Sequence, residues 1–153
     1  MALTSSDLPA DVAVLLRRIQ NDLFDVGADL CLPLAQDYAY EPLRVRAAWV
    51  TELEEAIDRY NDQLPKLTTF VLAGGTSQAA HLHLARTVSR RAERSVWAAI
   101  EEYGADVDGG VNSLAAQYLN RLSDLLFVLA RCVNVAAGRD DALWQPGGGR
   151  EAQ

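Results

Sequence analysis

Four long stretches of this sequence place apolar residues three and four positions apart, which is the spacing of one face of an α-helix. They cover about residues 9–30, 45–63, 78–103 and 113–133. No stretch shows the strict alternation of apolar and polar residues that a half-buried strand requires. Long helices with modest connections favour an up-and-down helical bundle, in which ligand sites lie between facing helices. The sequence therefore predicts an all-α fold.

Residues that favour helix ends bound these stretches. Asp7 is placed to cap the first helix, Thr76 or Ser77 can cap the third, and Gly104 is expected to end the third as an αL residue. Between the second and third helices, residues 66–78 carry β-branched side chains ahead of two glycines, which predicts an extended connector. The stripes expected to face the core are Val12, Leu15, Leu16, Ile19, Leu23, Val26 and Leu30 on the first helix, and Leu119, Leu122, Leu126, Leu129 and Val133 on the fourth.

Length and charge exclude several classes of protein. The chain has 153 residues, of which 50% are apolar, enough for one domain with its own core. Its 14 basic and 21 acidic residues give a net charge of −7, which argues against non-specific binding to nucleic acid or anionic lipid. The most apolar run, residues 125–137, is interrupted by Arg131 and Asn134 and is too short to span a membrane. Two cysteines and no charged-then-apolar leader lead us to expect a soluble, cytoplasmic protein with reduced thiols.

Four arginines, Arg86, Arg90, Arg91 and Arg94, lie within nine positions of the third predicted helix. Spacing of four places Arg86, Arg90 and Arg94 in one column. Guanidinium groups bind phosphate oxygens with two parallel hydrogen bonds, so such a column suits a polyphosphate. A solvated or ion-paired helix face explains the same pattern, because surface arginines are ordinary. The pattern alone leaves both interpretations open.

The fourth helix carries a second polar column, Asn120, Asp124 and Arg131, with Phe127 between them, opposite its leucine stripe. An amide and a carboxylate facing the arginines would hold those side chains in place. The alternative is an exposed face on which Asp124 pairs with a neighbouring arginine.

His81 and His83 are two positions apart and therefore point to different sides of a helix, which disfavours a metal pair. We expect one histidine to pack at a helix interface and the other to be exposed. The segment Gly74-Gly75-Thr76, which precedes the third predicted helix, is interpreted as an N-cap turn, since it lacks the spacing of a phosphate-binding loop.

Four strings of the sequence, taken in order, resemble the PduO-type ATP:cob(I)alamin adenosyltransferases, a family of corrinoid adenosyltransferases. The resemblance spans about residues 12–144 and rests on LRRIQNDLFDVGADL, FVLAGG, LHLARTVSRRAERSVW and YLNRLSDLLFVLAR. It implies a five-helix bundle that assembles as a homotrimer, with active sites in the clefts between subunits. It also implies that cobalamin and Mg²⁺·ATP meet there, and that cobalt(I) attacks the 5′-carbon of ATP to give adenosylcobalamin and triphosphate.

The resemblance also assigns roles to individual residues. It implies that Arg86 and Arg90 contact ATP and stabilise the departing triphosphate, that Arg91 and Glu93 belong to the same ATP-binding signature, and that Asn120 binds the nucleotide. Because cobalt is the nucleophile, the protein would supply only positioning, electrostatic neutralisation and exclusion of water.

Phe70 corresponds, by the same resemblance, to the aromatic residue that closes the lower face of the corrin and displaces its dimethylbenzimidazole ligand. Without the resemblance, Phe70 would be assigned to the core. The resemblance further implies a reductase, such as a flavin reductase, that supplies cobalt(I), and an adenosylcobalamin-dependent enzyme that receives the product.

The sequence departs from the family pattern at its start. The family begins with a T-G-D-x-G-x-T loop and an acidic helix, and this sequence enters the pattern about one helix later. We expect residues 1–144 to form a bundle without that loop and helix, and residues 145–153 to form a flexible tail. This departure fits a part of a longer protein, a mis-set start, or a family member that lost the loop. The last case would give a non-catalytic cobalamin-binding or delivery bundle, and a purely structural bundle is a third candidate.

Overall fold

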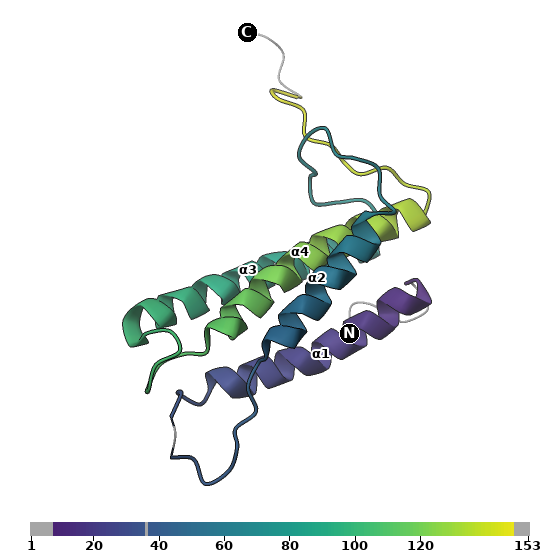
Figure 1. Ribbon diagram of the computed structural model, residues 1–153. Helices are drawn as coiled ribbons and strands as arrows, with labels where there is room; N and C mark the ends of the chain where they lie inside the picture. Colours follow the sequence, from purple (N-terminus) through teal and green to yellow (C-terminus); the bar gives the residue numbers. More distant parts are fainter. Residues whose placement is uncertain (1–7, 36, 149–153) are drawn as a thin grey trace.

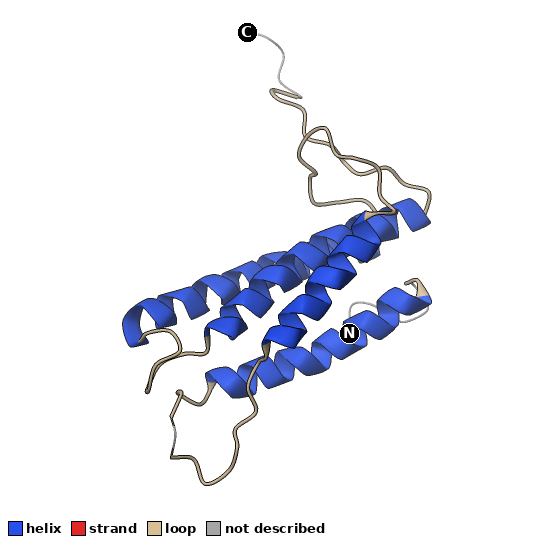
Figure 2. Cartoon of the chain, viewed as in Figure 1, coloured by secondary structure: helices blue, strands red, loops and turns tan. Residues whose placement is uncertain are grey.

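The computed structural model describes residues 8–35 and 37–148 and contains four α-helices, as the sequence predicts. They are α1 (Ala10–Leu30), α2 (Ala47–Asn61), α3 (Ser77–Tyr103) and α4 (Ser113–Ala136), shown in Figure 1. Outside the helices, the described residues form loops with two isolated β-bridges and no strand (Figure 2). None of the helices in this described part is long and apolar enough to cross a membrane.

The helix ends differ from the predicted ones by a few residues. Helix α1 begins after Pro9, and the cap predicted at Asp7 lies outside the described residues. The Thr76 hydroxyl accepts the N–H of Ala79 and so caps α3, as predicted. Gly104 ends α3 with φ 89° and ψ 154°, so its φ is positive as expected but its ψ lies outside the αL region. The predicted tail of residues 145–153 falls largely outside the described residues.

Helix α4 is the central element of the bundle. It packs along α3 and α2 and also contacts α1. Its predicted stripe is buried in full, and residues on both sides of that stripe are buried as well. A helix that is buried nearly all round must be covered from several directions, which is why α2 and α3 lie on either side of it in Figure 1.

Helix α1 is less completely covered than its apolar stripe predicts. Leu23 and Leu30 were expected in the core, yet they are 39% and 38% exposed. An open apolar groove of about 540 Å³ runs between α1 and α3. Leu16 and Leu23 line it on the α1 side and Leu84 and Val88 on the α3 side, and leucines of α4 form its floor. The stripe on α1 therefore faces two surfaces, the α4 core and this groove.

A buried carboxylate ties the loops together at the end of the bundle where α1 stops. Asp29 is 1% exposed, and its side chain accepts hydrogen bonds from the Arg44 guanidinium, the Val45 N–H and the Asn112 side-chain amide, each at 2.7 Å. A buried charge is tolerated when it is paired and fully hydrogen-bonded, as here. Asp29 thereby fixes the start of α2 and the start of α4 relative to α1.

Candidate functional site

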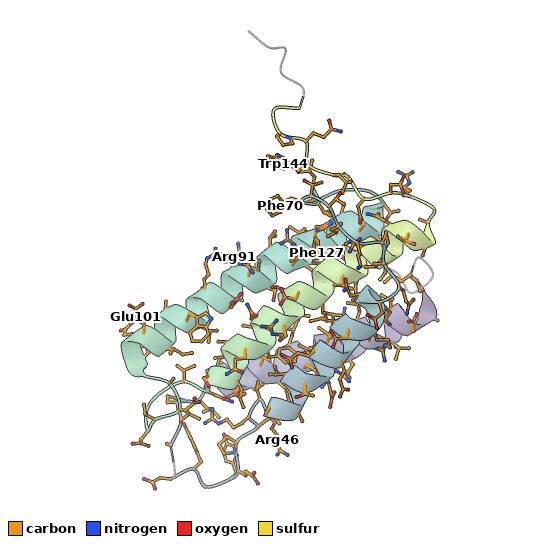
Figure 3. All side chains as sticks on the ribbon, turned by 45° about the horizontal axis from the view of Figure 1, so that its top comes forward. Arg46, Phe70, Arg91, Glu101, Phe127 and Trp144 are labelled. Atoms are coloured by element: carbon orange, nitrogen blue, oxygen red, sulfur yellow. The ribbon has the colours of Figure 1, made fainter. Side chains whose placement is uncertain are left out.

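The four clustered arginines all lie on α3, and they have no acidic partner in the described part of the chain. Arg90, Arg91 and Arg94 are exposed, and Arg86 is half-buried. The ion pairs among residues 8–35 and 37–148 use other arginines, namely Arg18, Arg44, Arg121 and Arg131. Figure 3 shows Arg91 projecting from the outer side of α3. The positive charge of this row, Arg86 to Arg94, is therefore available to an anion from outside the described chain.

Asn120 connects the arginine row to α4. Its side-chain amide donates to the Glu93 carboxylate at 2.8 Å, so two of the predicted site residues meet across the α3–α4 interface. The bond leaves the second carboxylate oxygen of Glu93 and the carbonyl oxygen of Asn120 free to bind other groups.

Neither Asp124 nor Arg131 forms an ion pair with the arginine row, although both were placed in one column with Asn120. Asp124 accepts from Arg121 of its own helix at 2.8 Å, which matches the alternative of pairing with a neighbouring arginine. Arg131 is 3% exposed and pairs with Asp141 beyond the end of α4. Residues 120, 124 and 131 share one face of α4 but lie at different heights along the helix, so they reach different neighbours.

Phe127 packs between α3 and α4 beside Arg86. The Arg86 guanidinium lies 5.9 Å from the centre of the Phe127 ring, and the His83 ring meets the same phenyl ring edge-on at 6.2 Å. The Nε of Arg86 is buried and has no hydrogen-bond partner among the described residues. The aromatic ring therefore orients Arg86 while leaving its hydrogen-bonding capacity unused.

His83 is the packed histidine, as predicted, whereas His81 is half-buried rather than exposed. Burial lowers the pKa of His83 below its ordinary value of 6.5, the charge of Arg86 lowers it further, and Asp141 acts in the opposite direction. The folded protein consequently favours the neutral imidazole beside Arg86.

The lowered pKa of His83 predicts a loss of stability in acid. The unfolded chain binds a proton at His83 more readily than the folded chain, so the free energy of unfolding should decrease as pH falls below about 6.5. Denaturant unfolding at about pH 7.5 and about pH 5 should show this decrease in the wild type and a smaller one in His83→Leu. His81→Leu is the matched control and should keep the wild-type pH dependence. Equal pH dependence in wild type and His83→Leu would contradict the prediction.

Phe70 lies in the connector between α2 and α3, outside the core. Its side chain is 75% exposed, so the assignment to the core made from the residues alone is wrong. The connector pairs with the segment that follows α4: the Trp144 N–H donates to the Phe70 carbonyl at 2.8 Å, and the Leu72 N–H donates to the Ala142 carbonyl at 2.7 Å. The Phe70 and Trp144 rings meet edge-on at 6.0 Å, beyond the end of the bundle (Figure 3). We call residues 66–75 and 139–144 the loop pair.

The candidate residues thus form two groups. Arg86, Glu93 and Asn120 make contacts across the α3–α4 interface. Phe70 lies in the loop pair, beyond the end of the bundle (Figure 3). Among the described residues, no hydrogen bond or aromatic contact joins Phe70 to the arginine row. Trp144 was not foreseen, because a single tryptophan near the end of a sequence carries no spacing signal.

Comparison with known proteins gives consistent matches. A family model described as cobalamin adenosyltransferase matches residues 1–133. A corrinoid adenosyltransferase of Mycobacterium tuberculosis is 52% identical over 137 residues, which are 90% of this chain and 67% of that protein. A cobalamin adenosyltransferase of Cupriavidus metallidurans is 48% identical over 145 residues, 95% of this chain and 72% of that protein.

Solved structures that resemble this chain belong to the same class of enzyme as these relatives. A phenylalanine-to-histidine variant of the PduO-type ATP:corrinoid adenosyltransferase from Lactobacillus reuteri, complexed with cobalamin and ATP, superposes with a TM-score of 0.79 at 34% identity. The match covers 89% of this chain and 69% of that one. An arginine-to-lysine variant of the same enzyme, complexed with ATP, gives a TM-score of 0.79 and 34% identity over 94% of this chain and 75% of that one.

Proposed function

This chain belongs to the cobalamin adenosyltransferase family, and we propose the reaction of that family as its function. It transfers the 5′-deoxyadenosyl group of ATP to the cobalt of cob(I)alamin, giving adenosylcobalamin and triphosphate. The observation that carries this proposal is the unpaired arginine row on α3, within a chain that matches corrinoid adenosyltransferases along most of its length. The substrate cobalt(I) is the nucleophile, so the protein needs to bind, align and neutralise rather than supply a nucleophile of its own.

The ATP site is proposed to consist of Arg86, Arg90, Arg91, Glu93 and Asn120. Arg86 and Arg90 would stabilise the negative charge of the departing triphosphate, because two guanidinium groups one helical turn apart can bind neighbouring phosphates. The contact between Glu93 and Asn120 supports the proposal, since it fixes two of these side chains across the α3–α4 interface. The unused Nε of Arg86 supports it as well.

Mg²⁺ is proposed to arrive bound to ATP. Such an ion takes most of its ligands from phosphates and water, and needs only one or two protein carboxylates. Within residues 8–35 and 37–148, no three His, Cys, Asp or Glu side chains are grouped to hold a metal ion by themselves. Glu93 has a free carboxylate oxygen on the arginine row and is the residue that could coordinate the ion, which would neutralise part of the phosphate charge.

Phe70 is proposed to face the lower side of the corrin. Its exposure leaves the ring available to a flat apolar ligand, and the Trp144 ring contacts it edge-on. Exclusion of the dimethylbenzimidazole ligand would leave cobalt(II) four-coordinate and easier to reduce, because an axial donor no longer raises the energy of the orbital that accepts the electron.

A homotrimer is proposed as the active assembly. The separation of Phe70 from the arginine row supports it, because a cleft between two protomers could bring the Phe70 of one against the arginines of the next. Exposed apolar side chains on α1, such as Phe24 at 82% and Val14 at 71%, give further support, since large exposed apolar surface marks interfaces.

We propose residues 1–144 as one bundle domain and residues 145–153 as its tail. The groove between α1 and α3 suits one further amphipathic helix, as the five-helix bundle of the family requires, because its walls and floor are apolar. Cobalt(I) is proposed to come from a reductase such as a flavin reductase, and the product to pass to an adenosylcobalamin-dependent enzyme. We infer a cytoplasmic location from the two free cysteines.

An anaerobic assay tests the function directly. The chain is mixed with cob(I)alamin and Mg²⁺·ATP, and the loss of the reduced-corrin absorbance is followed. Adenosylation that requires both substrates is the expected result. Binding of cob(II)alamin with conversion to the four-coordinate form, but no adenosylation, would instead indicate the non-catalytic cobalamin-binding protein. Absence of any spectral change would indicate a structural bundle and overturn the proposal.

A further inference from the structure

We propose that Arg131, Asn134 and Asp141 are positioning residues for this reaction, because together they lock the loop pair that carries Phe70 onto the last turns of α4. We call these three residues the α4 latch. The inference rests on the proposed function, since it concerns how Phe70 is held for the corrin. It adds three side chains that lie outside the proposed ATP and cobalamin sites.

Arg131 fastens the start of the connector. Its guanidinium donates to the carbonyl oxygen of Pro65 at 2.7 Å and to the Asp141 carboxylate at 2.7 Å. The Arg131 and Asp141 side chains are only 3% and 7% exposed, so water screens the pair weakly. One buried arginine thus joins the entry of the connector to the segment that follows α4.

Asn134 fastens the other end of the connector. Its side-chain oxygen accepts the backbone N–H of Thr76 at 2.9 Å, and its amide group points toward the Gly74 carbonyl at 3.4 Å and the Asp141 carboxylate at 3.5 Å. Gly75 has φ 101°, and any side chain at this position would overlap the Asn134 side chain. The turn into α3 therefore lies directly against Asn134, and only glycine allows this approach.

Between these two anchors, the loop pair has few contacts with the rest of the bundle. Its apolar side chains are largely exposed. The two segments are joined by the isolated antiparallel bridge of Val71 with Leu143, by the Phe70–Trp144 ring contact and by a hydrogen bond from the Thr69 hydroxyl to the Trp144 carbonyl at 3.3 Å. A two-stranded pairing of this kind is marginal in water by itself. The position of the Phe70 ring consequently depends on the latch at the base of the loops, where Asp141 contacts both Arg131 and Asn134.

The chemistry of the latch favours positioning over general stability. Replacing a buried ion pair by apolar residues is often neutral or stabilising, so a buried arginine and carboxylate are a poor way to gain stability alone. They do fix one geometry, because their hydrogen bonds are directional. In this protein, the segment whose geometry they fix is the exposed loop pair that carries Phe70, not the core.

The first test measures the loops without any ligand. In Asp141→Asn the carboxylate charge is removed while the shape is kept. Amide hydrogen exchange of Leu72 and Trp144, whose N–H groups join the loop pair, should accelerate at least about tenfold, the effect of losing one charge-assisted hydrogen bond. Glu52→Gln is the matched control, because Glu52 accepts from Arg18 at 2.7 Å in an exposed pair far along the sequence from the loops. Unchanged exchange in Asp141→Asn would overturn the proposal.

The second test measures the reaction. The same variant, bound to cob(II)alamin and ATP, should show a several-fold smaller four-coordinate fraction by electron paramagnetic resonance. Its KM for ATP with pre-reduced cob(I)alamin should stay near the wild-type value. Equal losses in both measurements would assign the latch a merely structural role and overturn the proposal. If wild type itself gives no four-coordinate signal, the proposed function fails, while the exchange measurement still reports whether the latch fixes the loops.

A second variant reaches the latch without removing a buried charge. In Gly75→Ala the new methyl group must displace the Asn134 side chain, so exchange at Leu72 and Trp144 and the four-coordinate fraction should change in the same direction as in Asp141→Asn. This variant decides the question if Asp141→Asn does not fold. Wild-type behaviour of Gly75→Ala in both measurements would contradict the proposal.

Discussion

Phe70→Ala is expected to slow adenosylation that starts from cob(II)alamin at least about tenfold, while leaving the rate from pre-reduced cob(I)alamin within about twofold of wild type. The expected difference follows from the proposed role, because the ring excludes an axial ligand and so matters before reduction of cobalt rather than after it. Stability should change little, since the Phe70 side chain is 75% exposed.

The two rates are measured anaerobically, one with a chemical reductant added to cob(II)alamin and one with cob(I)alamin prepared beforehand. Phe24→Ala is the matched control, because Phe24 is also a highly exposed phenylalanine but lies on α1. That variant should not distinguish the two starting oxidation states. Equal losses from both starting states in Phe70→Ala would remove the ligand-displacement role.

Arg90→Ala is expected to raise the KM for ATP by about 10- to 100-fold, the effect of losing a charge-assisted contact of about 1.5–3 kcal/mol. The helix should remain intact, since Arg90 is exposed and forms no ion pair with the described residues. Arg90→Lys should restore only part of the affinity, because an ammonium group keeps the charge but lacks the planar pair of donors.

Steady-state kinetics at saturating cob(I)alamin and varied ATP measure this effect. Arg46→Ala is the matched control, as Arg46 is an exposed arginine beside the start of α2, away from the arginine row (Figure 3). The thermal midpoint of each variant shows whether folding is retained. Wild-type ATP kinetics in a folded Arg90→Ala protein would exclude Arg90 from the ATP site.

The site was only partly predictable from the sequence. Spacing placed the four arginines on one helix, and the structure adds that they have no acidic partner within its described residues. The contact of Asn120 with Glu93 could be identified only once the packing of α4 on α3 was known. The same is true of the pairing of Asp124 with Arg121 instead of the arginine row. Arg131 was predicted as part of the polar column of the fourth helix and Asn134 was noted only as an interruption of an apolar run. Neither pattern indicated which groups these side chains bind.

The sequence by itself determined the four helices, their approximate ends and the resemblance to a family. These features depend on local properties, since side-chain periodicity, caps and glycines act within a few residues of one another. Helix α4 extends beyond the predicted end at Val133, to Ala136.

Only the tertiary structure decided which polar groups meet. Asp29 binds Asn112, which is 83 positions away in the sequence, and Arg131 binds Pro65, which is 66 positions away. No local sequence pattern predicts contacts between residues so far apart in the chain. The exposure of Phe70 and the open groove beside α1 were likewise decided by how the helices cover one another. Burial is a property of the packed chain, whereas periodicity is a property of each segment alone.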